Sequence, residues 1–418
     1  MLSIIFHSLL LLLSSPNHVD AFSSQPLETI KKRTGTSTKT IRIGTRPSPL
    51  AKIQTNQVAS KLERLSKNEN IRVEIIDITA TGDEENTKHF QQESKIDAPL
   101  AVQSVDFTST LDDALLRNEI DVAVHSCKDI PPANRWCKEN GKNLLTIASC
   151  LEREIPCDVL VYREEDWDVS WNDEMSIASL PYGSRVGTSA IRRQAQLLHL
   201  RNDLELVNLR GNVGSRLEAL KRGEVDALIL AYAGLKRLWE SSSDSTITAE
   251  LSSLHGGSIP NEPTLMYSPI PFDDILSGCC QGVVATVCRS ADSDTLDLLK
   301  GIDYLPSSIA VAAERSFLNE LDTFHPQTYK YKMKWKGRPP LAAYMSASTN
   351  ASNEDSVTNW NFQGLLTRPD GSKLIQTSRT YENEGIMPLE RAEEIGRDHA
   401  RELLSKAGAD FYLDDNED

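Results

Sequence analysis

The stretch from Val186 to Arg216 constrains the fold of this chain more than any other part of the sequence. It holds five arginines against two acidic residues, in a chain of 418 residues whose formal net charge is −15. These arginines are Arg192, Arg193, Arg201, Arg210 and Arg216. Such a local excess of positive charge indicates an anionic small ligand, because a nucleic-acid binder needs a broad basic face.

The residues around these arginines predict alternating helices and strands. Apolar residues at helical spacing follow Gly187, so we expect a helix there with Thr188 or Ser189 as its N-cap. A βαβ-like unit follows, with a strand over Leu204–Leu209, a helix over Asn212–Arg222 and a strand over Asp226–Ala231. Ligands bind at the carboxyl ends of strands in open α/β sheets, so we expect the arginines to mark a binding edge.

Arg192 and Arg193 fall in the first turn of the predicted helix. Free backbone N–H groups and the positive end of the helix dipole favour anions there. We therefore expect a cradle for a carboxylate or phosphate. The alternative for any single arginine is a solvated helix face, but the grouping at one predicted edge favours the cradle.

A strand and a helix nearer the N-terminus predict a second polar edge. The strand covers Thr40–Thr45, and Arg46 follows it directly. Ser48 as N-cap and Pro49 at the first helical position then begin a helix that runs to about Leu65.

Lys128 and Asp129 place a base and an acid side by side after a predicted strand over Ile120–His125. Pro131 ends the element, so the pair lies on a loop. A Lys-Asp pair is most often an exposed turn. Its position beside the predicted arginine edge favours a role in binding or chemistry.

The first 39 residues resemble a targeting segment. Met1–Ala21 contains an apolar run too short to span a bilayer, and Phe22–Thr40 is rich in Ser, Thr and Lys with Glu28 as its only acid. This order resembles the two-part plastid presequence of algae with secondary plastids. We expect delivery to the plastid (chloroplast stroma), with secretion as the alternative.

The seven cysteines form no CxxC pair and no framework spacing, and no Cys/His cluster suggests a metal site. Their odd number favours free thiols in a reducing compartment.

Six sequence blocks resemble one known family. In order between Gly44 and Arg289 they are GTRPSPLA, VHSCKDIPP, VGTSAIRRQAQL, LRGNVGSRL, ILAYAGLKRL and QGVVATVCR. They look like the successive signatures of hydroxymethylbilane synthases, also called porphobilinogen deaminases. The resemblance resumes in AAERSFLNEL, in GLLTRPDGSKLI and in a closing helix near Leu389 to Leu404.

The resemblance implies an α/β protein of three domains. The first two would resemble type II periplasmic binding protein lobes around a cleft, and the third would be a small α/β domain. We expect a presequence at 1–39, domain 1 at 40–146 and about 276–295, domain 2 at 147–275 and domain 3 at 303–418.

The resemblance also implies a transferase of tetrapyrrole biosynthesis. The family joins four porphobilinogen molecules head to tail, releases ammonia at each step and frees hydroxymethylbilane. The product grows on a dipyrromethane primer, which a thioether links to a cysteine of the third domain. The expected partners are porphobilinogen and pyrrole oligomers. We expect no nucleic acid, no membrane for the mature protein, and a monomer.

The residue types suit this chemistry. Porphobilinogen carries an acetate and a propionate, so a growing chain needs a row of fixed cations, and guanidinium groups bind carboxylates in bidentate fashion. Asp129 matches the family's catalytic aspartate, which would stabilise the cationic azafulvene and assist proton movement, with Lys128 alongside. By resemblance, binding falls to Arg46, Ser48, Thr188, Arg192, Arg193, Arg210, Arg216 and Arg237.

Two places depart from the family pattern. The position of the primer cysteine falls on Gly337, and no cysteine follows Cys288. Glycine has no nucleophile, so a thioether cannot form there. The loop that covers the cleft in the family corresponds to Asp97–Asp106, with its usual lysine at Ser104.

Three explanations of the missing cysteine stay open. The chain is a catalytically impaired paralogue that binds a polycarboxylate or pyrrole ligand, or it attaches a primer elsewhere, or a misjoined exon altered Phe324–Lys336. Cys127 and the Cys279-Cys280 pair are the candidates for attachment elsewhere, by their proximity to the proposed site.

Overall fold

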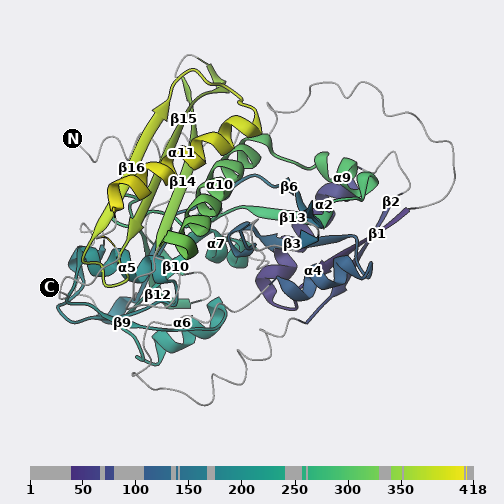
Figure 1. Cartoon of the computed structure of the whole chain (residues 1–418). Coiled ribbons are helices and arrows are strands. Elements are labelled where there is room, and N and C mark those ends of the chain that lie inside the picture. The colour runs from purple at the N-terminus through teal and green to yellow at the C-terminus, as the bar shows by residue number, and fades with distance from the viewer. Residues whose placement is uncertain are drawn as a thin grey trace.

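Within the described residues, the computed structural model has three main β-sheets, each packed around its own hydrophobic core (Figure 1). It describes residues 39–65, 71–79, 108–132, 138–139, 142–166, 175–240, 257–259, 262–328, 340–350, 353–408 and 411. The expected presequence through residue 38, the loop Asp97–Asp106 and Gly337 lie outside this part of the chain.

The first sheet carries the strands that lead to Arg46 and Lys128. Its strands are β1 (Lys39–Thr45), β2 (Ile71–Asp77), β3 (Val122–Ser126), β6 (Leu145–Cys150) and β13 (Val284–Arg289). They lie in the order β2-β1-β3-β13-β6; β1 is parallel to β2 and β3, and β13 is antiparallel to β3 and β6. Four of the five β3 residues are buried, as suits a central strand.

Helices cover this sheet and complete what we call the first lobe. They are α2 (Pro49–Leu65), α4 (Ser109–Leu116) and α9 (Ser293–Lys300), with a small ribbon of β4 (Lys138–Glu139) and β5 (Lys142–Asn143) nearby in sequence. Pro49 opens α2, where its fixed φ suits the first helical position and its missing N–H leaves nothing unpaired. The hydroxyl groups of Thr45 and Thr55 lie 2.8 Å apart and join β1 to α2.

The second sheet carries the arginine-rich stretch, and we call it with its helices the second lobe. Its strands are β7 (Asp158–Arg163), β8 (Arg185–Gly187), β9 (Glu205–Val207), β10 (Ala227–Ala231), β11 (Gly257–Ile259) and β12 (Glu262–Pro269), in the order β11-β12-β7-β10-β8-β9. Its helices are α5 (Ile191–Leu200), α6 (Val213–Lys221) and α7 (Tyr232–Glu240), and the short helical turns are η4 (Glu164–Asp166) and η5 (Ile177–Ser179). The parallel neighbours β10, β8 and β9 confirm the expected βαβ arrangement.

The third sheet is antiparallel and is covered on one face by two long helices (Figure 1). Its strands are β14 (Leu341–Asn350), β15 (Asn353–Thr367) and β16 (Leu374–Tyr381), and the helices are α10 (Leu305–Thr328) and α11 (Leu389–Ala407). Phe317, Trp360 and Phe362 are almost completely buried in its core. Figure 1 shows α10, in green, reaching from this sheet towards the first lobe, and α10 contacts β6 there.

One detail of the predictions is wrong. The N-cap of α5 is Ala190, not Thr188 or Ser189, because the N–H of Thr188 pairs with the carbonyl of Val207 and extends the β8–β9 pairing. The domain boundary expected between residues 146 and 147 falls inside β6, which belongs to the first sheet. Among the described residues, no helix combines the length and apolar character needed to cross a membrane.

Candidate active site

Lys128 and Asp129 lie on a short 3₁₀ turn, η2 (Cys127–Asp129), at the carboxyl end of β3. The N–H of Cys127 donates to the carbonyl of Val283 at 2.9 Å, and the N–H of Ile130 closes the turn on the carbonyl of Cys127 at 3.2 Å. Cys127 is fully buried, whereas Lys128 and Asp129 are exposed. The turn therefore fixes its buried residue in the core and presents the charged pair at the surface.

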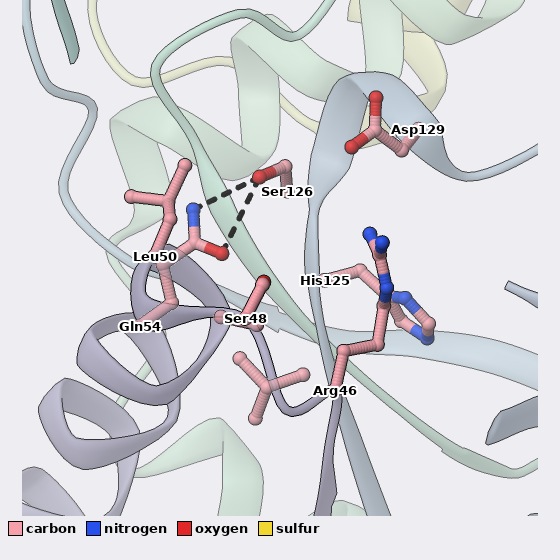
Figure 2. A pocket seen from close by; sticks show the side chains of 9 residues that line it. Arg46, Ser48, Leu50, Gln54, His125, Ser126 and Asp129 are labelled. Carbon is pink, nitrogen blue, oxygen red and sulfur yellow. Dashed lines mark hydrogen bonds between the residues drawn. The ribbon is translucent and has the colours of Figure 1, made fainter. Parts of the chain in front are cut away.

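A pocket of about 80 Å³ lies beside this turn. Arg46 and Ser48 line it from the loop between β1 and α2, and His125, Ser126 and Asp129 line it from β3 and η2. Figure 2 shows the guanidinium of Arg46 extending past His125 in the direction of Asp129. Two strand ends of the first sheet thus bring a cation and a carboxylate to one pocket, as expected from the sequence.

Gln54 forms the polar wall of this pocket opposite Arg46 (Figure 2). Its Nε2 donates to the hydroxyl of Ser126 at 2.9 Å, and it is only 4 % exposed. The backbone of Ser48 accepts the N–H of Lys52 at 3.1 Å, which fits the expected N-cap position. The hydroxyl of Ser48 therefore stays at the pocket, at the start of the helix.

Arg192 and Arg193 share one buried carboxylate, that of Asp158. Nη1 and Nη2 of Arg192 donate to the two carboxylate oxygens at 2.8 Å and 3.2 Å, and Nη2 of Arg193 donates at 2.7 Å. Asp158 begins β7 and is fully buried. Burial alone would raise the pKa of Asp158, but the charges and hydrogen bonds of the two arginines hold it well below its usual range.

Gln281 and Gly278 complete the arrangement from the segment before β13. The side chain of Gln281 accepts from Arg192 at 2.9 Å and donates to Asp158 at 2.8 Å. A Cβ on Gly278 would lie 2.6 Å from Nε of Arg192, so only glycine leaves room for this arginine. The segment thus fixes the position of Arg192 by close packing at Gly278 and by the hydrogen bond from Arg192 to Gln281.

Charges of the two lobes act on each other at Lys128. Part of the Lys128 side chain is exposed, but nearby protein atoms displace water from its ammonium group. This loss of hydration lowers the pKa of Lys128 to about 8. The charge of Asp129 opposes this shift, while those of Arg193 and Arg192 add to it. Lys128 of the first lobe therefore lies within electrostatic range of the arginines of the second.

The other predicted residues of the second lobe differ in how accessible they are. Arg210 is exposed, and Arg216 donates to the carbonyl of Gly211 at 3.0 Å and the hydroxyl of Ser189 at 3.4 Å. Burial, with the nearby charge of Arg193, lowers the pKa of Arg216 to about 10. Arg210 lies in the segment between β9 and α6, and Arg216 lies in α6.

Thr188 and Arg237 are largely occupied by contacts within the protein. Thr188 is fully buried, and its hydroxyl accepts the N–H of Ala190 at 3.3 Å. Arg237 is 6 % exposed and donates to the carbonyl of Gly282 at 2.7 Å. These placements leave both side chains little surface for a ligand.

Neither Asp158 nor Gln281 was expected as a site residue from the sequence. Asp158 stands at the start of an apolar strand, where a single acid carries no motif of its own. The signal that could have found it is the need of an adjacent arginine pair for a buried counter-charge.

The cysteines near the turn are poorly suited to nucleophilic attack. Cys127 and Cys280 are 0 % and 2 % exposed. A hydrogen bond with Cys150, together with burial, raises the pKa of the Cys127 thiol well above its usual value, although the hydrogen bond with Cys280 opposes this shift. The hydrogen bond with Cys127, together with burial, raises the pKa of the Cys280 thiol. Cys279 is half-buried, and burial raises the pKa of its thiol too. A reactive cysteine needs an accessible thiolate, so these three offer no ready attachment point.

The folds and the pocket together define a class: a multidomain α/β enzyme whose site gathers arginine, lysine and aspartate for an anionic substrate. Within the described residues, no group of His, Cys, Asp and Glu is arranged to hold a metal ion.

Comparisons with known proteins identify the family. The family profile described as "Porphobilinogen deaminase, dipyromethane cofactor binding domain" matches residues 41–297. The chloroplastic porphobilinogen deaminase of Oryza sativa subsp. japonica is 36 % identical over 377 residues, covering 89 % of this chain and 85 % of that protein. The porphobilinogen deaminase of Pelotomaculum thermopropionicum is 37 % identical over 373 residues, covering 88 % and 96 %. The chain belongs to the porphobilinogen deaminase family.

Solved structures of binding proteins also align with part of this chain. An amino-acid transporter substrate-binding protein of Streptococcus pneumoniae bound to L-arginine aligns with a TM-score of 0.33 at 14 % identity, covering 67 % of this chain and 93 % of that one.

Proposed function

We propose that this chain joins four porphobilinogen molecules head to tail into hydroxymethylbilane, with release of ammonia, in tetrapyrrole biosynthesis. The observation that carries the proposal is the pocket that Arg46, Ser48 and Asp129 line together at the carboxyl ends of β1 and β3. It supports the binding of a carboxylated substrate beside Asp129, with Lys128 exposed on the same turn.

In this proposal Asp129 is the catalytic residue. Loss of ammonia from the substrate leaves a cationic azafulvene, and attack by the neighbouring pyrrole must be followed by loss of a proton. A carboxylate hydrogen-bonded to the pyrrole N–H groups stabilises that cation and assists the proton movement. The exposure of Asp129 at the pocket supports this role.

Carboxylate binding falls to the cations with accessible donors. We propose that Arg46, Lys128, Arg210 and Arg216 contact the acetate and propionate groups, with Ser48 donating from the helix start. Arg192 and Arg193 together contribute about one net positive charge, because Asp158 neutralises one of their two charges. For Thr188 and Arg237 we propose a supporting role, because their side chains are buried.

The matched family region is the domain that binds dipyrromethane, and the residues present fit the carboxylates of that group. Arg46, Lys128, Arg210 and Arg216 would hold them, and the bound group would supply the pyrrole carbon from which the product is extended. A thioether does not fit as the family has it, because residue 337 is glycine and the described cysteines near the turn are buried.

Turnover and intact mass together test the proposed function. The purified mature chain should consume porphobilinogen and release hydroxymethylbilane with four ammonia molecules for each product. An added mass of two condensed porphobilinogens would establish covalent priming. Tight binding of porphobilinogen without any product, in protein that is folded, would favour the alternative of a non-catalytic binding protein.

Location, domain limits and assembly belong to the same proposal. Two relatives, from Oryza sativa and Pisum sativum, are named chloroplastic, and the Ser, Thr and Lys-rich start of this chain supports import into a plastid. A fluorescent fusion of residues 1–60 that is secreted would contradict this. We propose that the first domain boundary lies after Cys150 and that the other domain limits are those expected from the sequence. We also propose that the protein is a monomer, and sedimentation velocity tests this.

A further inference from the structure

We infer that Arg315, from helix α10 of the third sheet, is a positioning residue that holds the turn carrying Lys128 and Asp129. The inference rests on the proposed function, because it concerns the aspartate to which that proposal assigns catalysis.

The side chains of Lys128 and Asp129 depend on their backbone for direction. Both are exposed, and within the described residues neither makes a side-chain hydrogen bond. The turn itself is closed by one hydrogen bond, from the N–H of Ile130 to the carbonyl of Cys127. Contacts at the ends of the turn must therefore set where its charged groups point.

Arg315 forms two hydrogen bonds with the backbone at the end of the turn. Its Nη1 donates to the carbonyl of Ile130 at 3.1 Å and its Nη2 donates to the carbonyl of Pro131 at 2.7 Å. The side chain is only 9 % exposed. A planar guanidinium bonded to two successive carbonyls fixes the orientation of both peptide groups, which a single point donor does not.

The preceding residue of α10 restrains the entry of the turn. The carboxylate of Glu314, fully buried, accepts the N–H of Cys280. Three residues further on, the carbonyl of Val283 accepts the N–H of Cys127 at 2.9 Å. Adjacent residues of one helix thus hold both ends of the turn, directly at the exit and through the Cys280–Val283 segment at the entry.

Replacing the forked donor tests this inference. In Arg315→Gln we expect amide hydrogen exchange over residues 127–130 to rise about tenfold, since one or two charge-assisted hydrogen bonds are lost. We expect kcat to fall about tenfold or more while KM changes less than about threefold, because geometry at Asp129 changes and the carboxylate-binding cations stay. Arg315→Lys should recover part of both losses.

A matched variant on the same helix separates positioning from stability. Leu321 lies in the core of the third sheet and does not touch the turn, so Leu321→Ala should lower the melting temperature and leave kcat and exchange of the turn unchanged. The inference is overturned if Arg315→Gln only lowers the melting temperature, or if its turn exchanges at the wild-type rate. Exchange needs no turnover, so an inactive wild type would contradict the proposed function and leave this comparison decisive.

Discussion

Asp158 determines how much positive charge the second lobe presents to a ligand. Two buried guanidinium groups without a counter-charge would repel each other and carry a desolvation cost of several kcal/mol. One carboxylate against two guanidiniums leaves about one positive charge, while the hydrogen bonds fix both arginines in place. The arginine pair therefore still attracts a substrate carboxylate, and Asp158 offsets the repulsion between the two guanidinium groups.

Lys128 should control the alkaline limb of the pH profile. Its pKa is lowered to about 8, so it loses its charge as the pH rises through that value. Because carboxylate binding needs the charged form, kcat/KM of the wild type should fall about tenfold between pH 7 and pH 9. In Lys128→Arg the guanidinium stays charged, and the limb should move towards pH 10, where Arg216 begins to titrate.

A steady-state pH series on both proteins measures this limb. Lys52→Arg is the matched control, because Lys52 is exposed and its charge is paired with the carboxylate of Asp77. An identical limb in wild type and Lys128→Arg would show that another group titrates near pH 8.

At the scale of elements, the strands and helices that carry the site were predictable from the sequence. Pro49 and the apolar spacing behind it predicted α2 through Leu65, and the apolar run before Lys128 predicted β3. Local patterns suffice there because the elements end at strong signals. The grouping of Arg46 with Asp129 followed from the rule that strand ends share one edge of a sheet.

Tertiary pairing decided what the sequence could not show. Thr188 has the residue type of an N-cap, but its N–H pairs with the carbonyl of Val207 in the neighbouring strand, and the helix begins three residues later, at Ile191. The buried partner of Arg192 and Arg193 lies 34 and 35 residues away in the chain. Local spacing carries no information about such a contact. It also carries none about the hydrogen bonds from Arg315 to the carbonyl groups of Ile130 and Pro131.

The segment before β13 should prove sensitive to a single methyl group. In Gly278→Ala the new Cβ would lie 2.6 Å from Nε of Arg192, so this arginine must shift away from Asp158. We expect KM for porphobilinogen to rise about tenfold, since displacing one charged donor costs roughly 1.4 kcal/mol.

Substrate-saturation kinetics measure this effect, and Gly301→Ala serves as the control. Its Cβ would lie 2.7 Å from the flexible end of Leu65, remote from the pocket, so KM should stay at the wild-type value. Equal KM values in wild type and Gly278→Ala would contradict the assigned part of Arg192 in binding.

At the scale of the whole molecule, an ion pair and hydrogen bonds connect the third sheet to the segments beside the site. Arg153, in the segment that leaves the first sheet after β6, pairs with the buried carboxylate of Glu314. That carboxylate also accepts the N–H of Met345 from β14 at 2.8 Å. One acid of α10 thus links the third sheet to the segments that connect the first two.

The central claim is that cations of two lobes hold a carboxylated pyrrole chain against Asp129. A crystal structure of the chain with a bound porphobilinogen oligomer measures this most directly. The account predicts a pyrrole N–H within hydrogen-bonding distance of the Asp129 carboxylate, with substrate carboxylates on Arg46 and Arg216. An oligomer bound elsewhere, with Asp129 facing only solvent, would contradict it.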